Sequence, residues 1–223
     1  MKIVIFLGAP GSGKGTVADR VEERLGYTHV STGNMLREAV KAGTAVGEAA
    51  KSYMERGELV PDEVMIKVIE ARMDAGGADA AFMFDGYPRT VEQAELLEKS
   101  LEGRGGTLEK VVFLDAPRDV LIRRLTGRRT CRDCGACFHV ETMPPKKEGV
   151  CDDCGGELYQ RPDDQEETIA NRLDVYNSQT ESLVSRYEEQ GVLVRVDSDR
   201  PVAPLVEDVA ALFESDADAS DGQ

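Results

Sequence analysis

A glycine-rich loop set between an apolar run and a helical pattern opens the chain. Residues 2–7 are an apolar, β-branched run of strand length, and the residues after Lys14 place apolar side chains at helical spacing. The segment between them, GAPGSGKGT at 8–16, fits the phosphate-loop pattern G-x-x-x-x-G-K, although Gly15 separates the lysine from the hydroxyl of Thr16. Glycines let backbone N–H groups and the positive helix end approach an anion closely. The alternative is an ordinary glycine-rich turn, but this strand, loop and helix predict a cradle for the phosphates of a nucleoside triphosphate.

Strand and helix patterns alternate along most of the remaining chain. Further strand-like runs recur at 27–31, 81–85, 111–115 and 192–197, with helical patterns between them. This alternation predicts an α/β fold, with a parallel sheet of five strands flanked by helices on both faces. Ligands of such sheets bind beyond the carboxyl ends of the strands, where the phosphate loop, Asp85 and Asp115 are expected to lie.

Two segments interrupt the alternation. Residues 32–60, the first insert, have the pattern of short helices, and residues 127–164, the second insert, contain every cysteine. The core is therefore expected to comprise residues 1–31, 61–126 and 165–213. The acidic residues 214–223 lack an apolar period and are predicted to be a disordered tail.

Composition and charge narrow the class of protein. With 223 residues and 41% hydrophobic content, the chain can build one sizeable core that carries inserted lobes. The formal net charge of −15 argues against nucleic acid as a partner, because a polyanion requires a basic surface. No run approaches the roughly 20 apolar residues of a membrane span, and residues 2–7 are too short for a leader. We expect a soluble, cytoplasmic protein; its acidity fits either a high-salt habitat or a self-repelling surface.

The second insert carries two C-x-x-C pairs, CRDC at 131–134 and CDDC at 151–154. Sixteen residues lie between Cys134 and Cys151, within the spacing of a four-thiolate zinc site. Disulfides or free thiols are the alternatives, but an intracellular chain disfavours disulfides. We predict a closed, structural zinc site with Cys131, Cys134, Cys151 and Cys154 as ligands. Cys137 is the odd cysteine, either a small apolar filler or a residue facing a ligand.

Taken together, the motifs resemble those of bacterial adenylate kinases of the long form with a zinc-bearing lid. The resemblance covers residues 1–213 and rests on GAPGSGKGT, STGNMLR (31–37), FDGYPRT (84–90), LTGRR (125–129), the cysteine pairs and RPDDQEETIANRL (161–173). It also accounts for Gly15. It implies reversible, magnesium-dependent transfer of the γ-phosphoryl group of ATP to AMP, giving two ADP. It further implies a monomer in which 32–60 is an AMP-binding lobe and 127–164 a mobile lid over ATP.

The resemblance also implies roles for individual residues. Catalytic roles fall to Lys14, Arg89, Arg124, Arg128, Arg161 and Arg172. ATP contacts fall to Gly11, Ser12, Gly13, Lys14, Gly15, Thr16, Arg128, Cys137, Phe138 and Arg200. AMP contacts fall to Thr32, Arg37, Glu58, Leu59, Val60, Gly86, Tyr87, Pro88, Arg89, Gln93, Arg161 and Arg172. Within the AMP set, Arg89 would grip the phosphate and Gln93 would read the adenine edge, while Thr16 and Asp85 would support magnesium through water.

Several residues keep more than one interpretation. Arg124, Arg128 and Arg129 also fit the solvated end of a helix. The pair at 163 and 164 fits either an acidic first helical turn or a partner of arginines across a closed lid. We interpret His29 as structural, and His139 as a residue of the core or surroundings of the zinc site.

Three other functions remain possible at this point. The nearest is a kinase of UMP, CMP or GMP. A GTPase switch would require the guanine-reading pattern N-K-x-D, which does not occur in the sequence. A zinc-ribbon binding module would not need the α/β core, and the net charge disfavours a nucleic-acid partner.

Overall fold

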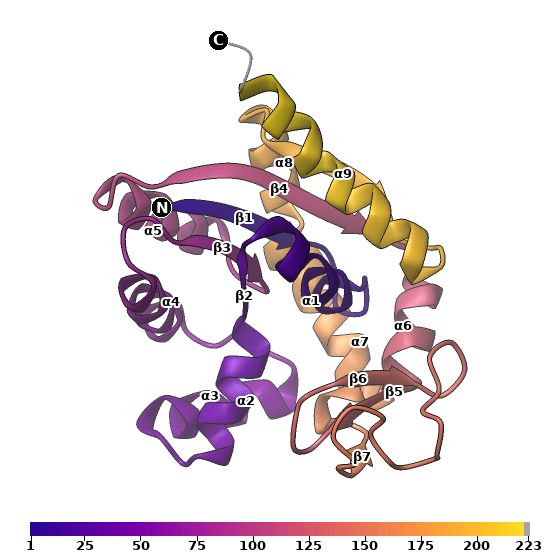
Figure 1. Cartoon of the computed structure of the whole chain (residues 1–223). Helices are drawn as coiled ribbons and strands as arrows, with labels where there is room; N and C mark the ends of the chain where they lie inside the picture. Colours follow the sequence, from indigo (N-terminus) through magenta and orange to yellow (C-terminus); the bar gives the residue numbers. More distant parts are fainter. Residues whose placement is uncertain (221–223) are drawn as a thin grey trace.

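A five-stranded parallel sheet forms the centre of the computed structural model, which describes residues 1–220 (Figure 1). The strand order is β2-β3-β1-β4-β8, so the N-terminal strand lies in the middle. The strands are β1 (Lys2–Leu7), β2 (Thr28–Ser31), β3 (Ala81–Asp85), β4 (Thr107–Asp115) and β8 (Leu193–Asp197). The predicted fold class is confirmed. β4 begins four residues before the predicted run, because its polar first residues pair with β1 past a shift in register.

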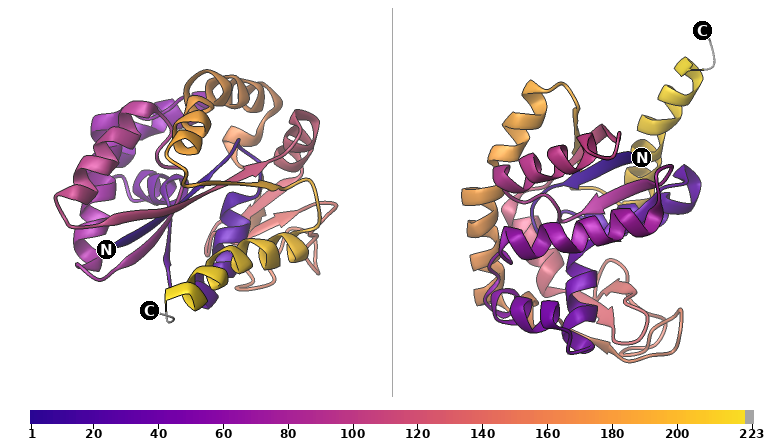
Figure 2. Two further views of the ribbon diagram at one scale, coloured as in Figure 1. Left: turned by 90° about the horizontal axis from the view of Figure 1, so that it is seen from above. Right: turned by 90° about the vertical axis from the view of Figure 1, so that its left-hand side faces the viewer.

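Helices cover both faces of the sheet (Figure 2). The core helices are α1 (Lys14–Leu25), α4 (Asp62–Gly76), α5 (Val91–Glu102), α6 (Arg118–Thr126), α7 (Glu166–Val175), α8 (Ser182–Glu189) and α9 (Val202–Ser220). A 3-10 turn, η1 (Pro162–Asp164), precedes α7, and a π-helical segment, η2 (Tyr176–Thr180), joins α7 to α8.

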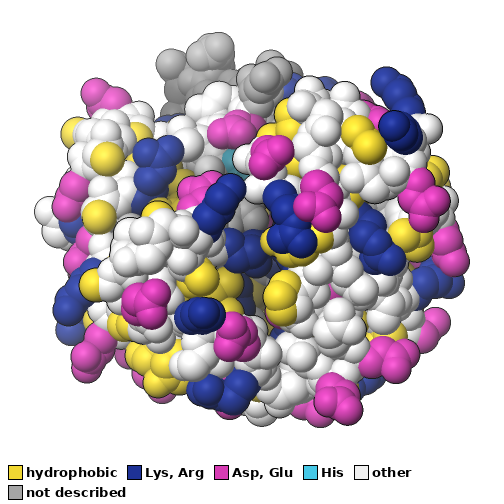
Figure 3. All heavy atoms as spheres, turned by 90° about the horizontal axis from the view of Figure 1, so that it is seen from below, with side chains coloured by type: hydrophobic (Ala, Val, Ile, Leu, Met, Phe, Trp, Pro, Cys, Tyr) yellow, Lys and Arg dark blue, Asp and Glu magenta, His cyan; other side chains and the backbone are white. Residues whose placement is uncertain are grey.

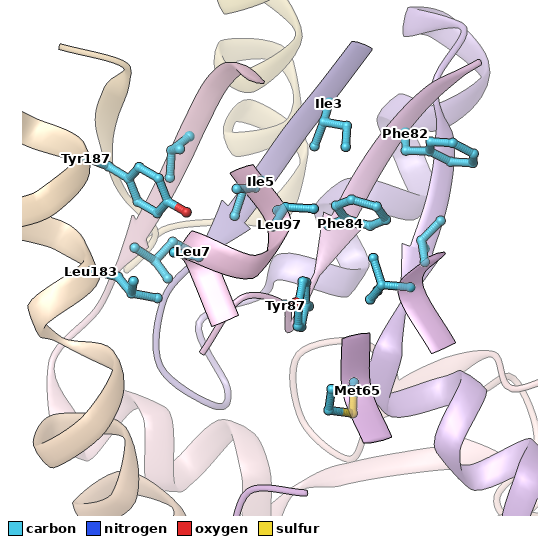
Figure 4. Close-up of a cluster of buried hydrophobic side chains, with 14 of the residues drawn as sticks. Ile3, Ile5, Leu7, Met65, Phe82, Phe84, Tyr87, Leu97, Leu183 and Tyr187 are labelled. Atoms are coloured by element: carbon cyan, nitrogen blue, oxygen red, sulfur yellow. The ribbon is translucent and has the colours of Figure 1, made fainter. Parts of the chain in front are cut away.

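Alternate residues of each strand face opposite sides of the sheet, so β1 feeds two hydrophobic clusters. Ile3 and Ile5 pack with side chains of α4, α5 and α8, among them Leu97 and Tyr187 (Figure 4). Val4 and Phe6 pack on the other face with α1 and α9. Burial on both faces explains why the central strands are apolar throughout rather than alternating with polar residues.

The two inserts differ in construction. The first insert contains α2 (Thr32–Lys41) and α3 (Ala45–Arg56), and the hydroxyl of Thr44 caps α3 by accepting from the N–H of Gly47 at 3.1 Å. The second insert contains a small antiparallel sheet of β5 (Arg128–Cys131), β6 (Cys137–His139) and β7 (Leu158–Tyr159). Its buried cluster has only Cys131, Cys151 and Leu158 at its centre.

The C-terminal helix corrects one prediction. A disordered tail was expected from residue 214, but α9 continues to Ser220, and Glu214 forms an ion pair with Arg24 of α1 at 2.8 Å. The last apolar turn of α9 packs against the sheet, so the acidic residues that follow extend a helix already anchored there. Residues 221–223 lie outside the described part. Within residues 1–220, no helix combines the length and apolar character needed to cross a membrane.

Candidate active site

A cavity of about 760 Å³ lies beyond the carboxyl ends of β1, β2 and β3, between the two inserts. Seen from this side, lysine and arginine side chains gather around a recess (Figure 3). Ten lysines and arginines line the cavity against five aspartates and glutamates, in a chain whose net charge is −15. The cavity is therefore a positively charged pocket in an acidic protein, and it has the size of a small-molecule site.

The phosphate loop forms one wall of this cavity. Gly13 has a φ of 97°, a left-handed conformation that suits glycine, and it directly precedes α1. The ammonium of Lys14 folds back and donates to the carbonyls of Gly8 at 2.7 Å and Ala9 at 2.9 Å. Burial lowers the pKa of Lys14 to about 8, although Asp85 opposes this effect. A phosphate group in the loop would supply the negative charge that the buried ammonium lacks.

Asp85, at the end of β3, places a carboxylate beside the phosphate loop. Its Oδ2 lies 3.5 Å from the hydroxyl of Ser31 and 3.9 Å from Nε2 of His29. Burial alone would raise the pKa of Asp85, but His29 and Lys14 hold it below its usual value. An ionised carboxylate beside Gly15, in the loop that also carries the Thr16 hydroxyl, is the donor chemistry that magnesium prefers.

The histidine behind Asp85 is held by a second carboxylate. Nδ1 of His29 lies 2.7 Å from Oδ1 of Asp19 on α1, and Nε2 of His29 is buried without a hydrogen-bond partner in the described structure. Burial disfavours the imidazolium, but the two aspartates outweigh it and raise the pKa of His29 to about 9. His29 is thus a buried cation behind the site. The sequence contains no spacing signal that links Asp19 to Asp85.

Four arginines, of which one is buried and three are half-buried, converge on the cavity from separate elements: Arg89 after β3, Arg128 in β5, the buried Arg161 before η1 and Arg172 in α7. The guanidinium of Arg89 donates to the carbonyl of Gly86 at 2.7 Å, and that of Arg161 to the Thr130 hydroxyl at 2.8 Å. Burial lowers the pKa of Arg89, Arg161 and Arg172. Arginine nevertheless remains charged in proteins, so this group of cations is a strong site for anions.

Asp163 and Asp164 are the counter-ions of these arginines. Arg128 forms a bidentate pair with the fully buried Asp164, at 2.8 and 2.6 Å. Arg172 pairs with Asp163 at 2.9 Å and with Asp164 at 3.2 Å. Burial would raise the pKa of Asp163, but the arginines, Arg172 first, lower it. The aspartates lie in the η1 turn and also bind arginines, whereas the dependence of this pairing on lid closure stays a prediction.

The predicted ATP wall lies at the side of α6 and β6. Cys137 and Phe138 line the cavity. Arg124 donates to the carbonyl of Ser198 at 2.7 Å, and Arg200 pairs with Asp208 at 2.7 Å. In the described structure, neither Arg124 nor Arg200 forms an ion pair with Asp163 or Asp164. Arg129 donates only to carbonyls of its own segment in the described structure, at 126 and 128.

The predicted AMP wall lies where the first insert meets β3. Thr32 donates to the carbonyl of Gly86 at 2.9 Å, and Arg37 donates to Asn34 at 2.6 Å. The side chain of Gln93 accepts from the backbone N–H of Arg89 at 2.8 Å. Glu58, Leu59, Val60 and Pro88 also line the cavity.

Tyr87 departs from the predicted AMP wall. Its side chain does not line the cavity but packs in the core against Phe84, as Figure 4 shows. An aromatic ring follows the apolar strand β3 here, and the hydrophobic cluster beneath the sheet accommodates it. The side chain of Tyr87 therefore belongs to the core, and an AMP contact at this position stays a prediction.

Gln93 has a second partner that the sequence did not indicate. Its Nε2 donates to Oδ1 of Asp62, the first residue of α4, at 2.6 Å. Both ends of the Gln93 side chain are thus fixed, and its amide is presented at the cavity in one orientation. Asp62 lies 31 positions away in the sequence, and no motif joins the two residues.

The four predicted zinc ligands lie together in the second insert. Their sulfur atoms are all within 4.8 Å of one another, with Cys131 and Cys154 at 3.4 Å and Cys134 and Cys151 at 3.6 Å. A tetrahedral zinc site with Zn–S bonds of about 2.3 Å places its sulfurs about 3.8 Å apart. The geometry therefore fits zinc. Cys137 is outside the group.

Histidine does not complete this cysteine group. His139 is buried, and its Nδ1 accepts from the N–H groups of Glu141 and Thr142 at 3.1 Å each. Its Nε2 lies 3.2 Å from the carbonyl of Arg123 in α6. His139 thus joins the second insert to the core.

A parallel sheet with a phosphate loop, a buried lysine and a convergent set of arginines defines a nucleotide-binding phosphotransferase. The family model described as adenylate kinase matches residues 6–192. An adenylate kinase of Carboxydothermus hydrogenoformans is 52% identical over 202 residues, which is 91% of this chain and 94% of that protein. Those of Bacillus licheniformis and Archaeoglobus fulgidus are 47% and 46% identical, over 94% and 95% of this chain and 97% of each relative.

These matches place the chain in a particular family. It belongs to the adenylate kinase family. Its four-cysteine cluster fits the zinc-binding long form of that family.

Proposed function

We propose that this chain is an ATP:AMP phosphotransferase, in which a phosphate oxygen of AMP attacks the γ-phosphorus of ATP. The bond from the γ-phosphorus to the β,γ-bridging oxygen breaks, and the two products are ADP. The observation that carries the proposal is the excess of cations lining the cavity of an acidic protein. Two polyanions must meet end to end in this reaction, so positioning and charge neutralisation dominate the catalysis.

The phosphate loop and the arginines divide this work. We assign the ATP phosphates to the loop, with Lys14 on the transferring group. Arg124, Arg128, Arg161 and Arg172 surround the phosphoryl group in transit. Their planar guanidinium groups bind phosphate oxygens through two hydrogen bonds at once, and they are charged at any working pH. No general base is needed, because the AMP phosphate is already ionised.

The AMP site is assigned to the wall formed by the first insert and β3. Arg89 binds the phosphate, and Arg37 lies on the same side with a pKa lowered by burial and by neighbouring guanidiniums. The Gln93 amide, oriented by Asp62, reads the adenine edge. Its fixed orientation supports adenine over other bases.

Two metal ions complete the proposal. Asp85 and Thr16 are the residues that would support magnesium, and the ion would supply positive charge to the ATP phosphates. Zinc on the four cysteines stabilises the second insert. Among the described residues, these four cysteines are the one group of side chains close enough together to hold a metal ion. Four thiolates would fill all four positions of a tetrahedral zinc ion and leave none for a substrate or water.

We infer that the two inserts are mobile lobes, 32–60 closing over AMP and 127–164 over ATP. Water in an open site would accept the phosphoryl group, so closure must exclude it. The protein is proposed to act as a cytoplasmic monomer that maintains adenine nucleotide balance. A nucleic-acid partner is not proposed, given the net charge.

An acceptor panel tests the function. Purified protein with ATP and magnesium is given AMP, CMP, UMP, GMP or water alone, and ADP is measured. We expect strong ADP formation with AMP only. Transfer to another monophosphate would overturn the role of Gln93, and hydrolysis without an acceptor would overturn the kinase assignment.

The Arg89→Ala variant tests the division of the site. It should raise the AMP KM by about tenfold or more, because a buried charged hydrogen-bond partner of the phosphate is lost, and leave ATP affinity in calorimetry unchanged. Loss of ATP affinity instead would contradict the placement of AMP at this wall.

A further inference from the structure

Two side chains donate hydrogen bonds across the boundary of the first insert to backbone carbonyls. Lys41 Nζ, in the last turn of α2, donates to the carbonyl of Arg132 in the second insert at 3.2 Å. Asn171 Nδ2, on α7, donates to the carbonyl of Arg56 at the end of α3 at 2.6 Å. The first insert is thus joined at one end to the cysteine-bearing insert and at the other to the helix that carries Arg172.

The contact at α3 is closely packed. Gly57 ends this helix in the left-handed conformation, with a φ of 72°. A Cβ at Gly57 would lie 2.7 Å from Cγ of Arg172 and 3.1 Å from Cγ2 of Thr168, so α3 reaches α7 without a gap. The last carbonyls of a helix have no partner within it and carry its negative pole, which makes an outside N–H donor favourable. Asn171 supplies such a donor from a different part of the fold.

The contact at α2 has a rigid acceptor. Arg132 lies between Cys131 and Cys134, and its own N–H donates to the carbonyl of Glu157 at 3.0 Å. The Arg132 side chain pairs with Glu157 at 2.9 Å and lies over the Tyr159 ring at 4.2 Å. The carbonyl that Lys41 reaches is therefore fixed by the cysteine pair and by β7. Lys41 in turn is a cation at the C-terminal end of α2, where the helix dipole favours it.

We propose that Lys41 and Asn171 form an interlobe clasp, a pair of hydrogen bonds that holds the first insert closed against the second insert and α7. The proposal rests on the proposed function, in which the first insert closes over AMP. When the insert opens, both carbonyls and both donors return to water, so each bond is worth only about 0.5–1.5 kcal/mol. The clasp therefore favours the closed position of the first insert without making it permanent. It also places residues 58–60, which follow α3, beside Arg172, the next residue after Asn171.

Lys41 and Asn171 are therefore positioning residues. Both are exposed, and neither lines the cavity, so they act through the placement of the insert rather than on the nucleotide. Their removal should weaken the use of AMP more than the use of ATP.

The kinetic test compares donor-deleting with donor-keeping variants. The donor-deleting variants are Lys41→Met and the isosteric Asn171→Asp. The donor-keeping variants are Lys41→Arg and Asn171→Gln, each of which retains an N–H donor at its position. The matched controls, at exposed positions, are Lys51→Met and Asn177→Ala. Each deletion should raise the AMP KM about three- to tenfold, and the tenfold end of this range corresponds to the loss of about 1.4 kcal/mol. The ATP affinity should stay within about twofold of wild type. Donor-keeping variants should recover most of the wild-type KM. An unchanged AMP KM in both deletion variants would overturn the clasp, as would an equal loss for ATP and AMP.

A second readout needs no turnover. Fluorophores at the exposed positions 48 and 148, introduced by non-cysteine labelling, report the distance between the inserts by energy transfer. With AMP and ATP present, the deletion variants should shift the population toward low transfer, while their unfolding in urea matches that of the controls. An unshifted distribution would refute the clasp even where KM changes. If the wild type fails to phosphorylate AMP in the acceptor panel, the proposed function fails instead, and the ligand-free distribution still tests the two contacts.

Discussion

The sheet core and the second insert solve the same folding problem by different means. The core buries complete apolar side chains on both faces of five strands, from Ile3 and Phe84 to Leu114. The second insert has three short strands and a buried centre of Cys131, Cys151 and Leu158. A segment with so little apolar surface gains little free energy from burial to offset its ordering entropy, and in the proposed zinc site four thiolates on one cation would supply the rest.

This difference matters because the site draws on both regions. Lys14 and Asp85 sit on the sheet, whereas Arg128 and Arg161 are on or beside the small sheet of the second insert. The first pair is placed by a hydrophobic core and the second by a segment with almost none. A change at Lys14 should therefore alter chemistry without loss of stability, whereas a change at the cysteines should alter stability first.

The largest expected effect is on activity, from Lys14→Met. Removal of a charge at the transferring phosphoryl group should lower kcat/KM about 10³-fold in the coupled ADP assay. The thermal midpoint should stay close to that of wild type, because the bonds of Lys14 are to carbonyls of its own loop and its ammonium is costly to bury. The exposed Lys67→Met is the control. Activity within tenfold of wild type would contradict the placement of phosphate at this loop.

The second effect is on stability, from Cys131→Ser. Loss of one ligand from a structural site should cost about 4 kcal/mol or more, which lowers the apparent Tm by about 10 °C at roughly 2–4 °C per kcal/mol. Cys137→Ser is the matched control, since Cys137 lies outside the sulfur group and should keep both the metal and the Tm. Metal analysis and scanning calorimetry, before and after chelation, measure both. A metal-free wild type whose Tm is insensitive to chelation would remove zinc from this account.

The smallest expected effect is on the pH dependence of stability, and it comes from His29, whose ion pairs lie in the core and not at the cysteine group. His29 has a pKa of about 9 in the fold and about 6.5 when unfolded, so its stabilisation is complete below pH 6.5 and disappears as the pH rises through 9. His29→Gln should therefore cost on the order of 2 kcal/mol at pH 6 and much less at pH 9.5, in urea unfolding.

Asp19→Asn provides the control for this effect. It removes the nearest carboxylate from His29 and should flatten the same pH dependence. A cost of His29→Gln that does not vary with pH would show that the fold does not raise the pKa of His29 above its unfolded value.

Patterns of neighbouring residues predicted those features whose residues all lie within a short stretch of the sequence. The phosphate loop, the apolar strands and the cysteine pairs each combine neighbouring residues, and their positions in the structure match the prediction. Local patterns did not indicate that the side chain of Tyr87, a motif residue, faces the core, and the prediction was wrong at residues 214–220, where an acidic segment continues a helix. In both cases packing of distant elements outweighed the local signal.

The sequence by itself determined the phosphate loop, the two-sided sheet and the four-cysteine group, because each depends on spacing along one stretch of chain. Only the tertiary structure decided how Arg128 pairs with Asp164, how Asp62 orients Gln93, and which carbonyls Lys41 and Asn171 reach. These pairs join residues brought together by the crossing of separate elements. The energy of each pair depends on burial and distance in the folded chain, and spacing along the sequence carries no record of either.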